Sequence, residues 1–128
     1  MVLSHETDDA RHPYWYARII RIFHVNVWDC RDESMTKPRR MNFLFVRWFG
    51  RDAKYKSGWS AKRLPRIGFI EHDDPFAFGF IDPEVVIRGV HLIPAFADGP
   101  TDDPLPEPSF ARRKGDLDCD WSYFHVNM

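Results

Sequence analysis

Residues 41–51, MNFLFVRWFGR, form the strongest strand signal in the chain. Seven of these eleven residues are apolar, and the aromatic and β-branched side chains in the middle of the segment are types that strands favour. Gly50 ends the apolar run. The pattern predicts a strand that is buried on at least one face and on which the hydrophobic core forms.

A longer strand is predicted upstream, over residues 14–27 (YWYARIIRIFHVNV). Trp15, Ile19 and Phe23 share one parity with most of the other apolar residues, and a period of two is typical of a strand. The alternation changes faces near residues 20–22, which predicts a bend there. The polar residues 29–40 are expected to form the loop between the two strands.

Three further strands are predicted downstream, where β-branched and aromatic residues return. They span residues 66–70, 85–93 and 121–127. Between the first two, Asp82 before Pro83 predicts a short capped helical turn. The bend that precedes this turn carries Phe76, Phe78 and Phe80, which are expected to fill the core.

These elements predict a mostly β fold, a small single-domain and barrel-like sheet of five or six strands with long irregular loops. Closing the sheet hides edges that a chain with 16% aromatic residues would otherwise expose. We expect residues 1–12 to be a mobile tail, 13–96 to form the β domain, 97–120 to be a Pro- and acid-rich loop, and 121–128 to add a closing strand. The predicted core is Trp15, Ile19, Phe23, Leu44, Val46, Trp48, Ile67, Phe69, Phe78, Phe80, Val86, Ile87, Val90 and Leu92.

Charge is distributed unevenly along the chain. Residues 37–66 hold ten Lys and Arg against the single acid Asp52, a net charge of +9, while the whole chain carries −1. Aromatic residues interleave with these cations, a mixture that suits phosphates and stacked bases. The candidate nucleic-acid-binding residues are Lys54, Lys56, Lys62 and Arg63, although a merely solvated loop explains them too. The acids of residues 98–120 are expected to compete for this basic stretch.

Surplus aromatic residues outside the predicted strands are candidates for contacts with a partner. Trp28 ends the strand-like run that begins at Tyr14, and Tyr55 and Trp59 lie in the basic segment after Gly50. If these three side chains converge on one exposed pocket, they form a partner-binding site for a protein or nucleosome surface.

Catalytic and metal-binding patterns are missing from the sequence. The six His and two Cys lack the close spacing of zinc ligands, and the segment around His72 is typical of a solvated turn. There is no nucleophile elbow and no glycine-rich phosphate loop. No apolar run approaches the ~20 residues of a membrane span. We therefore expect no enzyme activity, cofactor, small-molecule substrate or membrane insertion.

Two cysteines are too few for a disulfide framework, so a reducing compartment is expected, with a bridge between Cys30 and Cys119 as the alternative. The segment KPRR at residues 37–40 resembles a short nuclear-import signal. Together these features predict an intracellular, nuclear protein.

Several segments resemble a region near the C-terminus of proteins encoded by basidiomycete transposable elements of the Plavaka and Kyakuja-Dileera-Zisupton kind. These segments are HPYWYARIIRIFHVNV, FLFVRWFGRD, KRLPRIGFI, DPFAFGFIDPEVVIRGVHLIPAF and DWSYFHVN. The resemblance covers the chain from about Arg11 to its end. It implies transposon origin and a position outside the catalytic core of a transposase, so no catalytic residue is carried over.

The order YARIIRIF, FVRWFGR and VVIRGVHLI also resembles bromo-adjacent homology (BAH) domains, chromatin-associated β modules with a VRWFYRP-like strand. Here Gly50 stands in place of the usual aromatic residue, and no Pro follows Arg51. This resemblance implies binding to a protein or nucleosome surface. We therefore expect a non-catalytic protein or chromatin interaction module, with weak, sequence-independent nucleic-acid binding through residues 37–66 as the alternative.

Overall fold

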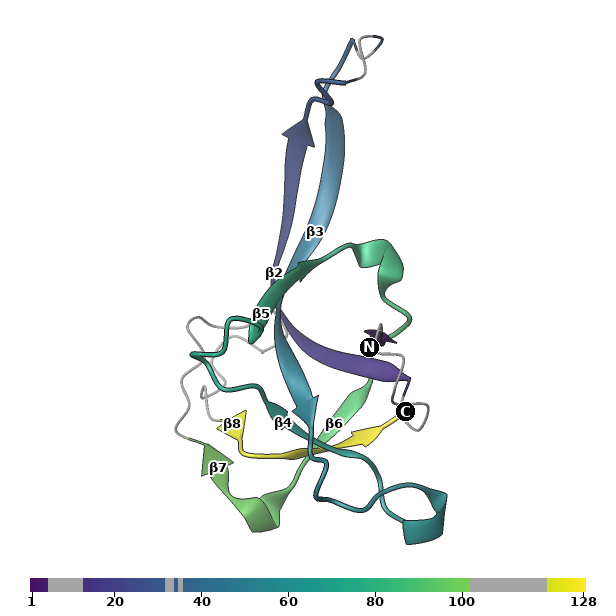
Figure 1. The fold of residues 1–128 in the computed structure, drawn as a ribbon, viewed down its shortest axis with the longest axis vertical. Coiled ribbons are helices and arrows are strands. Elements are labelled where there is room, and N and C mark those ends of the chain that lie inside the picture. Colours follow the sequence, from purple (N-terminus) through teal and green to yellow (C-terminus); the bar gives the residue numbers. More distant parts are fainter. Residues whose placement is uncertain (5–12, 32–33, 35, 102–119) are drawn as a thin grey trace.

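The computed structural model describes residues 1–4, 13–31, 34, 36–101 and 120–128. Antiparallel strands form a curled half-barrel in the order β1-β2-β3-β4-β9-β6, and β5 pairs with β3 beside this path (Figure 1). The strands of this sheet are β1 (Val2–Leu3), β2 (Tyr14–Val27), β3 (Arg39–Arg51), β4 (Arg66–Phe69), β5 (Phe78–Ile81), β6 (His91–Pro94) and β9 (Phe124–Asn127). The predicted mostly β fold is confirmed.

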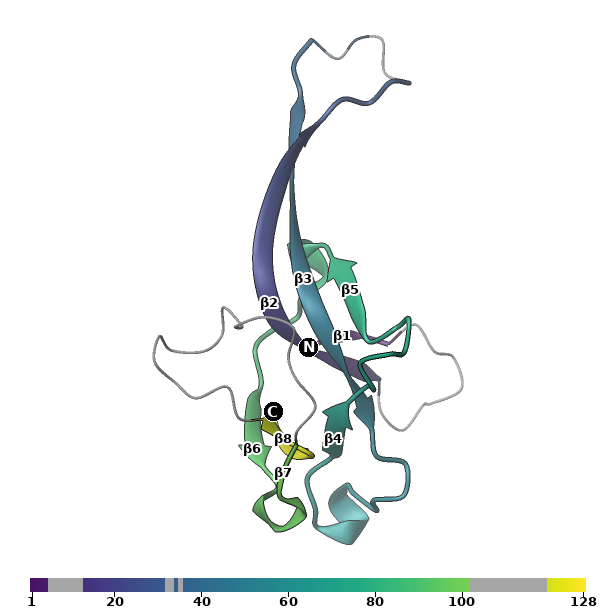
Figure 2. The ribbon, with the colours of Figure 1, turned by 90° about the vertical axis from the view of Figure 1, so that its left-hand side faces the viewer.

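Strand β3 is the centre of the sheet. It pairs with β2 along nearly its whole length, with β4 at its C-terminal end and with β5 in its middle. The register with β2 shifts between Ile19 and Arg21, so a β-bulge lies where the sequence predicts a bend. Beyond the end of β5, the two long strands pair only with each other among the described residues and form a two-stranded arm, made of residues 23–27 of β2 and 39–43 of β3 (Figures 1 and 2).

The two faces of β3 pack differently because side chains alternate along a strand. Phe49 belongs to the odd-numbered face, which contributes to a core with Tyr16, Ile67, Phe124 and Val126. The even-numbered face includes the buried Leu44 and Val46. It also includes Trp48, whose indole lies so close to Gly79 that a Cβ there would be 2.8 Å from the indole nitrogen. Glycine is therefore required in β5 for Trp48 to pack.

The predicted mobile tail is wrong for residues 1–4. Val2 and Leu3 pair with β2, and Val2 is buried. The amide of Ile87 donates to the carbonyl of Met1, and the Met1 amino group donates to the carbonyl of Arg88. Burial lowers the pKa of this amino group. Met1 also packs against the core cluster that contains Phe49. The N-terminal residues are therefore part of the fold, while residues 5–12 lie outside the described part.

Other predicted boundaries need correction. The strand expected over 85–93 begins only at His91, because residues 86–90 connect the 3-10 turn η2 (Pro83–Val85) to β6 without pairing as a strand. Asp82 caps η2 by accepting from the amide of Glu84, as predicted. The bend expected at residues 72–83 contains strand β5. The two ends of the loop predicted over residues 97–120 form secondary structure, namely η3 (Phe96–Asp98), β7 (Pro100–Thr101) and β8 (Asp120–Trp121). Residues 102–119 lie outside the described part.

The predicted core is partly wrong. Leu44, Val46 and Ile67 are buried, but Phe23, Phe80 and Ile87 are exposed. The other predicted core residues are half-buried. In β2 the fully buried side chains are Tyr16 and Ile20. Both are even-numbered, whereas the period-two pattern assigned the odd-numbered residues to the core. Further buried residues that the sequence did not predict are Phe49, Ala77, Ala95, Phe124, Val126 and the charged Arg47 and Asp120.

Tyr16 shows how completely the core excludes water. Its side chain is buried, and its hydroxyl donates to the sulfur of Met128 at 3.5 Å. Burial, with a smaller contribution from the nearby Tyr14, raises the pKa of Tyr16 to about 12. The folded state therefore keeps this phenol neutral where an unfolded chain would ionise it, so its contribution to stability falls as the pH rises from about 10 towards about 12.

The core assignment predicts that alanine substitutions at two isoleucines lower the free energy of unfolding by different amounts. Ile67→Ala should lower the free energy of unfolding by about 2–5 kcal/mol, because it leaves a cavity around a side chain that is fully buried. Ile87→Ala should cost less than about 1 kcal/mol, because Ile87 is 47% exposed. Urea denaturation followed by tryptophan fluorescence measures both, and equal losses would contradict this assignment.

Candidate interaction surfaces

The three predicted partner-binding aromatics do not converge. Trp28 directly follows β2 at the far end of the arm, and it is 57% exposed. Tyr55 and Trp59 belong to the connection between β3 and β4, at the opposite end of the molecule (Figure 1). The 13 residues of β3 separate the end of β2, where Trp28 lies, from the connection that carries Tyr55 and Trp59. A single pocket formed by Trp28, Tyr55 and Trp59 is therefore wrong.

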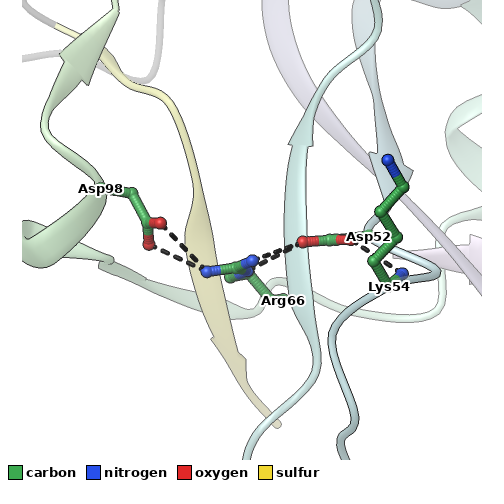
Figure 3. Close-up of polar contacts among 4 residues, drawn as sticks. All are labelled: Asp52, Lys54, Arg66 and Asp98. Carbon is green, nitrogen blue, oxygen red and sulfur yellow. Dashed lines mark hydrogen bonds and ion pairs between the residues drawn. The ribbon is translucent and has the colours of Figure 1, made fainter.

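Tyr55 is part of the scaffold, because its ring packs against Arg66. Figure 3 shows the polar contacts of Arg66 with Asp52 and Asp98, which we call the Arg66 cluster. The Arg66 guanidinium donates to Asp52 at 2.6 and 3.0 Å and to both carboxylate oxygens of Asp98 at 3.0 and 3.1 Å. Its central carbon lies 4.3 Å from the ring centre of Tyr55 and 4.5 Å from that of Tyr123. The Tyr55 ring thus already contacts a cation within the chain.

The Arg66 cluster ties together segments far apart in the sequence. Asp52 follows β3, Arg66 begins β4, and Asp98 ends η3. The hydrogen bond from Arg66 holds the pKa of Asp52 below its usual value, with burial opposing this shift and the amide of Lys54 adding to it. The Lys54 amide donates to Asp52 at 2.9 Å. The cluster therefore fixes the root of the β3–β4 connection.

The basic loop, residues 54–63, projects from this root. Its tip is closed by the 3-10 turn η1 (Trp59–Ala61) and by paired backbone bonds between Gly58 and Arg63. Trp59 is 99% exposed. The predicted nucleic-acid-binding residues Lys54, Lys56, Lys62 and Arg63 are all exposed. The structure thus brings these four cations onto one loop with a free indole, whereas most of the acids expected to compete with them lie at residues 102–119, outside the described part.

A further exposed apolar surface lies on the odd-numbered face of β3 and its neighbours. We call it the aromatic strip: Phe23, Phe43, Phe45, Phe78 and Phe80. Successive rings lie 5.1 to 5.8 Å apart between centroids. Phe80 is 65% exposed and Phe23 is 37% exposed. Val25 and Met41, which pair across the arm, extend the same face and are also exposed.

The aromatic strip continues the core outwards. Phe49 and Arg47 on the same face of β3 are buried, whereas Phe45 and Phe43 are half-buried. The guanidinium of Arg47 lies 4.5 Å from the ring centre of Phe69 and 5.5 Å from that of Phe78. The alternation of apolar residues that forms the strip is visible in the sequence. Its exposure is not, because exposure depends on how far the arm extends beyond the end of β5. The strip is the site that the sequence analysis missed.

An aromatic-lined hollow of about 490 Å³ lies near the start of β2. Trp15 and Trp48 meet edge to face in its wall, with ring centres 5.8 Å apart, and Phe76 and Arg51 also line it. The described residues of its lining include no carboxylate and no Ser, Cys or His side chain.

Other functional signals are limited within the described residues. No group of three or more His, Cys, Asp and Glu side chains there could hold a metal ion. No helix in that part has the length and apolar character to cross a membrane. Cys30 is exposed and free, so the alternative bridge to Cys119, itself outside the described part, is not formed. No protein-family model, curated protein or solved structure matches the chain.

The Arg66 cluster predicts an acid-sensitive contribution to stability. Asp52 has a lowered pKa when folded, so its contribution is present above the unfolded pKa of about 4 and is lost as the pH falls through the folded value. Asp52→Asn should therefore cost about 1–3 kcal/mol near neutral pH and should flatten the loss of stability in acid. Urea denaturation between neutral and acidic pH measures this.

Asp73→Asn is the matched control, because Asp73 is exposed in a turn. It should leave both the stability and its pH dependence unchanged. If the two variants lose stability in parallel as the pH falls, the Arg66 cluster does not carry the acid sensitivity.

Proposed function

We propose that this chain is a non-catalytic protein interaction module, and that the aromatic strip, which runs from β5 onto the arm, is its contact surface. The observation that carries the proposal is a row of ring contacts leading from the half-buried Phe78 and Phe45 to the exposed Phe80 and Phe23. Contiguous exposed apolar surface of this kind is costly in water unless a partner covers it. Aromatic anchors are also the side chains that contribute most to binding free energy.

The arm also supplies a charge preference. Arg39 and Arg40 are exposed on the two faces of the arm, and neither makes an ion pair within the described part of the chain. A partner with both apolar and acidic side chains would therefore complement the arm. The resemblance to BAH domains makes chromatin the first class of partner to test, with reconstituted nucleosomes as the probe.

The experiment uses peptides selected from a random display library for binding to the intact chain. Phe80→Ser should weaken the binding of the selected peptides by about tenfold or more, because it removes the most exposed ring of the aromatic strip. Fluorescence anisotropy measures the affinity, and thermal unfolding shows that the variant is folded.

Phe76→Ser is the matched control. Phe76 is 77% exposed but does not belong to the aromatic strip, so this variant should bind the selected peptides as the unchanged chain does. Peptides that are indifferent to Phe80→Ser, or equally weakened by both substitutions, would contradict the assignment of the strip as the contact surface.

A second candidate function is weak, sequence-independent nucleic-acid binding through the basic loop. The observation that favours it is the fully exposed indole of Trp59 among four exposed cations. The cations would meet backbone phosphates, and the indole would stack on an unpaired base with about 1–3 kcal/mol. Trp59 takes the stacking role here, because Tyr55 is engaged with Arg66.

Charge reversal tests this second candidate. Lys54→Glu combined with Lys56→Glu should abolish binding of a labelled single-stranded oligonucleotide at low salt, because phosphate contacts supply most of such affinity. Arg39→Glu combined with Arg40→Glu makes the same change in charge at the other end of β3 and should preserve binding. If the two double variants bind equally, net charge alone is responsible and the basic loop is not a site.

A further inference from the structure

One edge of β3, here called the bare edge, has no pairing strand along the arm among the residues that the structure describes. Strand β5 pairs with residues 44–47 of β3 and stops at Ile81, opposite Leu44. From there the chain turns away into η2, and residues 39–43 of β3 pair only with β2 in the described part of the chain. An unpaired edge exposes amide and carbonyl groups that another strand can use.

The alternation of hydrogen bonds identifies which groups face this edge. The amide of Trp48 donates to Ala77, and the carbonyl of Trp48 accepts from Ile70, so Trp48 turns both backbone groups away from β2. In an antiparallel strand every second residue does the same. The amides and carbonyls of Arg40 and Asn42 therefore point to the bare edge, whereas those of Met41 and Phe43 point to β2.

The side chains along the edge differ between the two faces. Met41 and Phe43 lie on the apolar face, and Phe80 packs edge to face against Phe43 with ring centres 5.5 Å apart. Arg40 and Asn42 lie on the opposite, polar face, joined by a hydrogen bond of 3.3 Å from the Arg40 side chain to the Asn42 side chain. A strand laid along this edge would need apolar residues at one parity and acidic residues at the other.

We propose that the partner of the aromatic strip is an extended protein segment with alternating apolar and acidic residues, which adds as an antiparallel strand to residues 39–43 of β3, in line with β5. This inference rests on the proposed function and names its mode of binding. Antiparallel pairing follows the pattern of all strand pairs in the described sheet. A second copy of the chain fits less well, because it would bring Arg39 and Arg40 of two arms together.

The probe is a labelled, capped peptide that alternates valine and glutamate, measured by fluorescence anisotropy against the intact chain. It should bind, and a peptide that alternates valine and lysine should bind at least about tenfold more weakly because its charges face Arg40. Absence of binding by the valine–glutamate peptide would overturn the proposal.

Backbone methylation of the peptide tests strand pairing without changing the protein. In the proposed register the glutamates lie opposite Arg40 and Asn42, so their amides point to β3, whereas the valine amides point to solvent. N-methylation of the glutamates should abolish binding, and N-methylation of the valines should preserve it. Equal binding by the two methylated peptides would overturn strand addition.

A variant of the protein tests the same edge from the other side. Asn42→Pro removes an amide that points to the bare edge and leaves the bonds to β2 in place, so it should weaken binding about tenfold. Asn42→Ala is the matched control and should bind as the unchanged chain does. If the two Asn42 variants bind the peptide equally well while Phe80→Ser weakens its binding, the aromatic strip binds the peptide without strand addition. If Phe80→Ser has no effect on the peptide either, the proposed function fails as well.

Discussion

The alternation of side chains along β3 is the constraint on which the rest of the structure depends. One face of this strand carries Phe49 and Arg47 into the core and Phe43 and Met41 onto the arm. Its partners change along the way, from β4 at one end to β5 in the middle and to β2 alone on the arm. A single apolar pattern is therefore buried at one end and exposed at the other.

The length of β3 also divides the positive charge of the chain. The strand has 13 residues, which corresponds to about 40 Å at the usual rise per residue. Arg39 and Arg40 lie at its beginning, while the basic loop follows its end. The positive charge of residues 37–66 is thus divided between two separate surfaces. Arg47, which lies between them in the sequence, is buried.

Much of the fold could be predicted from local patterns. The bounds of β2, the bend at residues 20–22 and the capped turn at Asp82 follow from alternation, from its interruption and from capping chemistry. The strand predicted over residues 85–93 forms only from His91, because contacts distant in sequence override local propensity. Met1 hydrogen-bonds to the backbone of Ile87 and Arg88, and residues 86–90 do not pair as a strand.

The candidate site was less predictable, for a physical reason. Composition indicated surplus aromatic residues, but loops were expected to carry them, and Phe23 and Phe80 were assigned to the core. Burial of a strand residue depends on whether another element covers its face, and nothing local to Phe23 reports that β5 ends at Ile81. The buried Arg47 and Asp120 escaped prediction in the same way, because charged side chains are buried only where tertiary partners exist.

The central claim is that β3 leaves a bare edge on the arm beside an exposed aromatic strip. Amide hydrogen exchange along β3 in the free chain, read residue by residue by NMR, tests it most directly. Protection should be present at Met41 and Phe43, which bond to β2, and at Leu44, which faces β5, but should be absent at Arg40 and Asn42. Slow exchange at Arg40 and Asn42 would mean that the edge is already covered, and it would contradict this account.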